Sequence, residues 1–124
     1  MKQSLIKEKS YEFALKIISL YKTLLKQNEY VLSRQVLKSG TSIGANVEEA
    51  LAGQSRADFL SKMAIASKEA RETNYWLRLV RDSDLIVGNK LESLLQESES
   101  IINILTAIVK TTSANAPKPR FKKS

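Results

Sequence analysis

Apolar residues recur every three to four positions along most of the chain, and this period constrains the fold more than any other feature. No run alternates apolar and polar residues for long enough to indicate a strand. Glycine and proline are scarce and lie between or just beside the periodic segments. The pattern therefore predicts an all-α protein with helices at roughly 5–27, 30–52, 55 to 82–84, and 89–110.

Each predicted helix has one apolar or small-residue face, which we expect to form a common core. In chain order the four faces are Ile6, Phe13, Ile17, Leu20, Tyr21 and Leu24; Leu32, Val36, Ser39, Ile43, Val47 and Ala50; Phe59, Met63, Ala66, Ala70, Asn74 and Leu77; and Leu91, Leu94, Leu95, Ser98, Ile101, Ile102, Leu105, Ile108 and Val109. Ser55 with Asp58, and Asn89 with Glu92, are typical helix-starting pairs. Short connections between four such helices predict an antiparallel up-down-up-down four-helix bundle.

The length of 124 residues fits one domain. We expect the bundle to occupy 1–110 and a disordered basic tail to occupy 111–124, where Thr, Ser, Asn, Pro and Lys replace the apolar period. Within the second helix, Gly40 and Gly44 lie four residues apart on one side. Because glycine disfavours a helix interior, this pair predicts close approach by a neighbouring helix, with a break near Gly40 as the alternative.

The chain contains neither Cys nor His, which narrows the chemistry open to it. Histidine acid–base catalysis, thiolate nucleophiles and imidazole or thiolate zinc sites are excluded within one chain. We therefore expect no catalytic residue, no metal, no cofactor and no enzymatic activity. No apolar stretch is long enough to span a bilayer, and no signal-peptide core precedes the first helix, so we expect a cytoplasmic location without membrane contact.

The net charge is +7, and the tail contributes four cations and no acid. A basic tail suits a phosphate-rich partner, whereas the alternative is a solvated end that maintains solubility. The candidate nucleic-acid-binding residues are Arg34, Lys38, Arg71, Arg78, Lys118, Arg120, Lys122 and Lys123.

Several large apolar residues lie off the predicted core faces. A bundle helix needs one apolar stripe, yet the first and third helices each carry a second one. Apolar residues that cluster on the surface indicate an interface, whereas single exposed apolar residues are common and need no explanation; here we favour the interface. The candidate interface residues, which predict an oligomer or a protein partner, are Tyr11, Ile18, Ile65, Tyr75, Trp76 and Leu79.

The second and third helices also carry a recognisable motif. The run from Gln35 to Ala50, QVLKSGTSIGANVEEA, with the fixed polar positions Gln35, Ser42, Asn46 and Glu49, resembles the signature of the four-helix-bundle proteins encoded in intervening sequences of bacterial 23S rRNA genes. The stretch 55–80 is similar to the same family through Phe59-Leu, Ile65-Ala, Lys68-Glu-Ala-Arg-Glu and Tyr75-Trp-Leu-Arg-Leu. The resemblance covers about 10–110.

The resemblance implies an antiparallel four-helix bundle. Relatives, including accessory proteins of diversity-generating retroelements, form five-fold rings with a basic surface, so a homopentamer is implied, and nucleic-acid binding is the usual proposal for the family. Two departures stand out. The basic pair that follows Gln35 in the family is Val36-Leu37-Lys38 here, and the closing Glu-Gly is Glu49-Ala50, which lets the helix extend toward Gly53.

Two further groups of polar residues have structural alternatives. Gln35, Ser39, Ser42 and Asn46 form one line beside the apolar stripe, and we favour hydrogen bonding that sets helix register over ligand recognition. The carboxylates Glu48, Glu49, Glu69 and Glu72 invite a di-metal site, but without His we expect surface pairing with Lys68, Arg71 and Arg56.

The sequence thus predicts a non-enzymatic homo-oligomeric bundle that binds RNA or DNA through a repeated basic surface. The alternative is a protein–protein scaffold without nucleic-acid binding.

Overall fold

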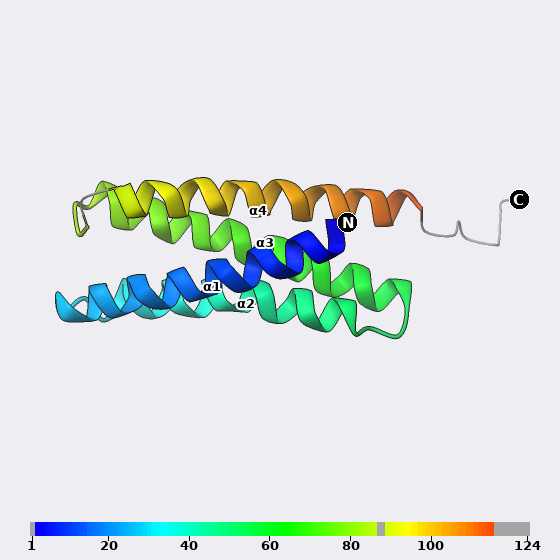
Figure 1. Cartoon of the computed structure of the whole chain (residues 1–124), viewed down its shortest axis with the longest axis horizontal. Helices are drawn as coiled ribbons and strands as arrows, with labels where there is room; N and C mark the ends of the chain where they lie inside the picture. Colours follow the sequence, from blue (N-terminus) through cyan, green and yellow to red (C-terminus); the bar gives the residue numbers. More distant parts are fainter. Residues whose placement is uncertain (1, 87–88, 116–124) are drawn as a thin grey trace, which may run out of the picture.

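The computed structural model describes residues 2–86 and 89–115. Its helices are α1 (Lys2–Lys26), α2 (Val31–Leu51), α3 (Arg56–Asp82) and α4 (Asn89–Ala114). The described part of the chain contains no strand. Successive helices run in opposite directions along one long bundle, which confirms the predicted fold class (Figure 1). None of the described helices is long and apolar enough to cross a membrane.

The helix ends have local causes. The Oγ of Ser55 accepts a hydrogen bond from the Asp58 amide at 3.1 Å, as its sequence position predicts. At the start of α2 the N-cap residue Tyr30 makes no side-chain cap, and a carboxylate oxygen of the preceding Glu29 accepts from the Leu32 amide at 2.5 Å instead. Helix α2 ends at Leu51, short of the extension to Gly53 that the sequence predicts.

Helix α4 runs past the predicted boundary at Lys110 and ends at Ala114. The Nη1 of Arg56, at the start of α3, donates to the Asn115 carbonyl at 2.8 Å. A guanidinium at this position gives a hydrogen-bond partner to a carbonyl at the end of α4, and its positive charge interacts favourably with the negative end of the helix dipole. The part of the predicted tail at 116–124 lies outside the described residues.

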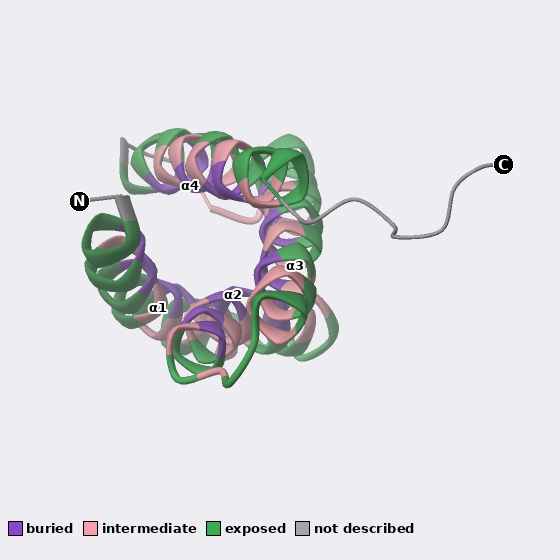
Figure 2. Cartoon of the chain, turned by 90° about the vertical axis from the view of Figure 1, so that its right-hand side faces the viewer, coloured by how far each residue is buried: buried purple, intermediate pink, exposed green. Residues whose placement is uncertain are grey.

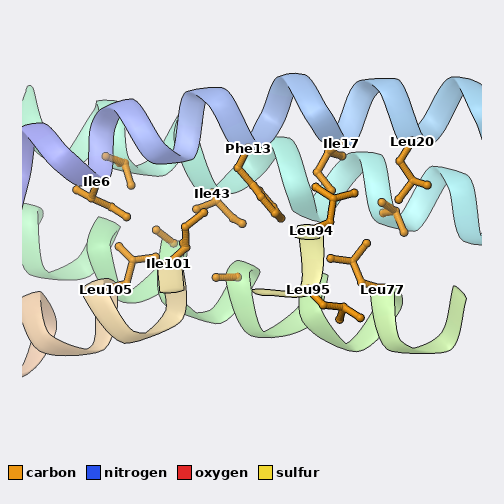
Figure 3. Packing of buried hydrophobic residues seen from close by; sticks show 14 of the residues in the cluster. Ile6, Phe13, Ile17, Leu20, Ile43, Leu77, Leu94, Leu95, Ile101 and Leu105 are labelled. Atoms are coloured by element: carbon orange, nitrogen blue, oxygen red, sulfur yellow. The ribbon is translucent and has the colours of Figure 1, made fainter. Parts of the chain in front are cut away.

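The core lies along the axis that the four helices surround, and buried positions line the inner side of each helix (Figure 2). Side chains of α1, among them Ile6, Phe13 and Ile17, point toward apolar residues of α3 and α4 (Figure 3). The predicted core faces are confirmed. The residues of those faces that remain partly accessible are Tyr21, Leu32, Phe59, Asn74, Ile102 and Val109.

The four seams between neighbouring helices are unequal. Helix α2 has close backbone contact with α3 and α1, α3 with α4, and the α1–α4 seam has the least. The diagonal pairs, α1 with α3 and α2 with α4, have no close backbone contact. Consequently the outer faces of α1 and α3 look in opposite directions.

The predicted close approach at the two glycines occurs at the α1–α2 seam. A Cβ atom at Gly40 would lie 2.8 Å from Cγ2 of Ile17, closer than real contacts permit. At Gly44 the nearest atom would be the Ser10 carbonyl oxygen at 3.4 Å, an ordinary contact. Helix α2 is continuous through both glycines, so the alternative of a break near Gly40 is wrong.

Two buried serines of α2 differ in how their hydroxyls are satisfied. The Ser39 Oγ donates to the Gln35 carbonyl at 3.0 Å and lies 2.9 Å from the Thr73 Oγ1 of α3, whose hydroxyl also reaches the Glu69 carbonyl at 2.7 Å. The Ser33 Oγ is equally buried but has no hydrogen-bond partner among the described residues. Burying a hydroxyl without a partner costs stability.

We predict opposite responses to alanine at the two glycines. Gly40→Ala lowers the free energy of unfolding by roughly 1–3 kcal/mol, because the new methyl group overpacks against Ile17. Gly44→Ala has room for its methyl group and raises helix propensity, so the free energy of unfolding stays level or rises by up to about 1 kcal/mol. Urea unfolding followed by circular dichroism measures both, and equal effects would contradict the assigned α1–α2 contact.

Alanine at the two serines should also act in opposite directions. Ser33→Ala removes an unsatisfied hydroxyl and raises the free energy of unfolding by about 1 kcal/mol. Ser39→Ala removes the hydroxyl contact with Thr73, whose own hydroxyl keeps the Glu69 carbonyl as a partner, and lowers the free energy of unfolding by about 0.5–1 kcal/mol. The same urea series tests this pair, and a stabilising Ser39→Ala would show that the contact between α2 and α3 contributes nothing.

Candidate nucleic-acid interface

The polar line of the motif lies along the seam between α2 and α3 and serves packing. Ser39 provides its contact across the seam, to Thr73. Half-buried Asn46 uses its Nδ2 within α2, donating to the Ser42 carbonyl at 2.9 Å and to the Ser42 Oγ at 3.2 Å. These bonds agree with the interpretation of the line as a structural feature of the bundle.

Of the four carboxylates expected to pair with cations at the surface, Glu48 and Glu49 do so, with other partners than expected, whereas Glu69 and Glu72 form no ion pair within the described residues. Glu49 pairs with Lys62 of α3 at 2.9 Å, and Glu48 lies 3.9 Å from Lys7 of α1. Glu72 accepts from the Trp76 Nε1 at 3.1 Å. Across 2–86 and 89–115, no three acidic side chains come together in a way that could hold a metal ion. Glu48 and Glu49 lie at the end of α2, beside the starts of α1 and α3, so they pair with Lys7 and Lys62 rather than with Lys68, Arg71 or Arg56.

The candidate cations do not form one surface. Arg34 and Lys38 are exposed on α2. Arg71 and Arg78 lie on α3, where Arg71 donates to Thr106 of α4 at 2.9 Å. Arg78 donates to the Asn74 Oδ1 at 2.9 Å and lies 5.6 Å from the centre of the Tyr75 ring. The tail cations Lys118, Arg120, Lys122 and Lys123 lie outside the described residues.

The α1–α2 hairpin places four exposed cations at one end of two adjacent helices, and two of them were not among the candidate residues. The short turn after Lys26 brings the end of α1 beside the start of α2, so exposed Lys22 and Lys26 join Arg34 and Lys38 at one end of the bundle. None of these four cations forms an ion pair within the described part of the chain. We call them the basic α1–α2 face. The helical wheel together with the short turn was the signal that could have identified it.

Nearby acids do not neutralise this face. Glu29 is engaged in capping Leu32. Other ion pairs lie elsewhere: the guanidinium of Arg81 hydrogen-bonds Asp82 at 2.8 Å and holds the pKa of that carboxyl below its usual value. Hydrogen bonding and charge attraction to Glu97 raise the pKa of Lys16. These pairs occupy cations outside the basic α1–α2 face and leave its charge available to solvent.

The candidate interface residues divide between opposite sides of the bundle. Tyr11 on α1 is 62% exposed and has exposed Leu15, absent from the candidate set, one turn away. Tyr75 and Leu79 on α3 are 47% and 36% exposed. Two patches result, which we call the α1 patch (Tyr11, Leu15 and Ile18) and the α3 patch (Tyr75, Trp76 and Leu79).

Three members of the candidate set are less accessible than the sequence suggests. Ile18, Ile65 and Trp76 are half-buried. The Trp76 ring packs partly against the core and meets Tyr75 edge-on, with ring centres 5.1 Å apart. Because helices α1 and α3 are diagonal, the two patches cannot form one continuous surface.

Comparison with known proteins finds one matching family and a similar crystal structure. The family described as 23S rRNA-intervening sequence protein matches residues 2–107. A crystal structure of a protein of unknown function from the S23 ribosomal protein family of Bacteroides thetaiotaomicron is 50% identical, with a TM-score of 0.85 over 89% of this chain and 99% of that chain. No curated protein matches.

The family match covers most of the chain, including the motif on α2 and the aromatic segment of α3, and the similar crystal structure agrees with it in fold. The chain therefore belongs to the 23S rRNA-intervening sequence protein family.

Proposed function

We propose that this protein is a non-enzymatic homo-oligomer that binds the phosphate backbone of RNA or DNA through the basic α1–α2 face, repeated around the assembly. The observation that carries the proposal is the cluster of four exposed cations, contributed by two adjacent helices and without an ion pair to any described residue. The proposal places the protein in the cytoplasm, where bacterial nucleic acid lies.

The two apolar patches support a head-to-tail assembly. A two-fold dimer pairs one surface with itself, whereas two different patches on opposite sides suit a heterologous contact. In such a contact the α1 patch of one copy packs against the α3 patch of the next. Repetition of this contact closes a ring when the rotation permits, and the homopentamer implied by the family resemblance is one such ring.

An assembly would strengthen a modest charge cluster. Each copy adds four cations from the basic α1–α2 face, and the tail sequence adds four more. Repeated cations raise the local potential and release counterions from nucleic acid. The connection between Lys26 and Arg34 also carries exposed Tyr30, whose ring can stack on any base, while the four cations suit phosphates, so we expect contacts mainly to the backbone and tolerance of sequence.

A protein–protein scaffold is the second candidate. The exposed rings of Tyr11 and Tyr75 favour it, because aromatic side chains are enriched at protein interfaces. In that case the basic α1–α2 face serves solubility. The two candidates differ in one measurable property, which is salt-dependent binding to nucleic acid.

We predict that the protein is larger than a monomer in solution. Light scattering after size exclusion should give a mass several times 13.9 kDa at tens of micromolar. The substitutions Tyr11→Ser and Leu79→Ser, one in each patch, should each reduce that mass, whereas Val31→Ser, an exposed apolar position outside both patches, should not. A monomeric wild-type protein at this concentration would overturn the oligomer.

We also predict salt-dependent binding that follows the basic α1–α2 face. Each phosphate that a variant no longer neutralises should reduce the magnitude of the slope of log affinity against log salt by about 0.9 on duplex DNA and about 0.7 on single strands. The triple variant Lys22→Gln, Arg34→Gln, Lys38→Gln should therefore flatten the slope. The matched control is Lys62→Gln, whose ammonium already pairs with Glu49 and should leave the slope unchanged.

Deletion of 116–124 tests the tail separately and preserves the bond between Arg56 and Asn115. We expect it to weaken binding to all sequences about equally. Absence of binding by the wild-type protein at low salt would replace this proposal with the scaffold. Binding that keeps the same slope in the triple variant would exclude the basic α1–α2 face.

A further inference from the structure

The loosely packed α1–α4 seam contains a groove that the proposed function does not use. The groove has a volume of about 270 Å³ and lies between the second half of α1 and the first turns of α4. Leu20, Leu91 and Leu94 line it, and these same side chains belong to the core, with exposed fractions of 8%, 2% and 5%. A molecule in the groove would therefore contact the hydrophobic core directly.

The walls of the α1–α4 groove are mainly apolar, and Ile86 adds to them. An apolar surface of this kind gains stability when an apolar group displaces water from it. Its volume lies just below the range typical of small-molecule sites in proteins. The groove therefore suits a small ligand with an apolar body.

The polar groups of the groove leave one positive charge uncompensated. Lys16 donates to a Glu97 carboxylate oxygen at 2.8 Å, and Ser93 donates to the same oxygen at 3.2 Å. These bonds use the only carboxylate among the lining residues. Lys90 also lines the groove and forms no ion pair with any described residue.

We propose that the α1–α4 groove binds a small organic monoanion with an apolar body, such as a medium-chain carboxylate, which places its anionic group on Lys90 and its chain against Leu20, Leu91 and Leu94. Lys90 lies in the first turn of α4, where the positive end of the helix dipole adds to the attraction. Glu97, which is bound by Lys16 and Ser93, lies about two helical turns beyond Lys90 along α4, so its negative charge is separated from the ligand's anionic group.

Other occupants fit less well. An added helix would need an open seam along the length of the bundle, but the groove is lined only by residues of 16–23 in α1, by Ile86 and by residues of 90–97 in α4 among the described residues. The tail sequence carries four cations, so its charge disfavours it as an occupant of a groove whose own excess charge is positive. The groove also shares no residue with the basic α1–α2 face, the α1 patch or the α3 patch, so the proposal stands apart from the proposed function.

The test compares two ligands with the same chain and opposite charge on the full-length protein. Isothermal titration with decanoate below its micelle concentration should show saturable binding with one site per chain, and decyltrimethylammonium should bind more weakly. Lys90→Gln should raise the Kd for decanoate roughly two- to fivefold, as expected for a solvent-accessible ion pair. Lys110→Gln, on α4 but outside the groove, is the matched control and should leave the Kd unchanged.

A filling variant tests the location of the site. Ser19→Trp places a large ring in the groove and should abolish saturable decanoate binding, whereas Ser61→Trp, at an exposed position of α3, should retain it. Circular dichroism checks that both variants keep their helix content. The proposal is overturned if the wild-type protein binds the two ligands with equal affinity or shows no saturable decanoate binding. It is also overturned if a folded Ser19→Trp variant binds decanoate as the wild-type protein does.

Discussion

The side chain of Ile17 on α1 packs onto the backbone of Gly40 on α2, at a distance that leaves no room for a Cβ atom. This contact fixes how close the first two helices come and the level at which they cross. The short turn after Lys26 then has to place the end of α1 beside the start of α2. The basic α1–α2 face is a consequence of that geometry, because each of the two helices contributes only part of the cluster.

The other seams between helices differ in their polar contacts and in how closely their backbones pack. Between α2 and α3 the hydroxyls of Ser39 and Thr73 meet inside the bundle, and Lys62 pairs with Glu49 at the surface. The α1–α4 seam has less backbone contact and is bridged near the groove by Lys16 and Glu97. Strong packing on one side of the bundle and looser packing on the other explain why the groove opens where it does.

The bundle also distributes different surfaces over different sides. Cations gather at the α1–α2 end, while Tyr11 and Tyr75 lie on diagonal helices that face away from each other. The groove shares no residue with either patch, whereas Lys22 lies one helical turn beyond Ile18, so the basic α1–α2 face adjoins the α1 patch.

The sequence by itself determined the four helices, their core faces, the cap at Ser55 and the close approach at Gly40, because periodicity and local capping depend on neighbours along the chain. It did not determine where α4 ends, since 111–114 remain helical while Arg56, far away in sequence, bonds the carbonyl of Asn115. Nor could it separate Arg34 and Lys38 from Arg71 and Arg78, or join them to Lys22 and Lys26. Which charges share a surface depends on which helices are neighbours and how they are rotated, and only the packing of side chains between helices decides that.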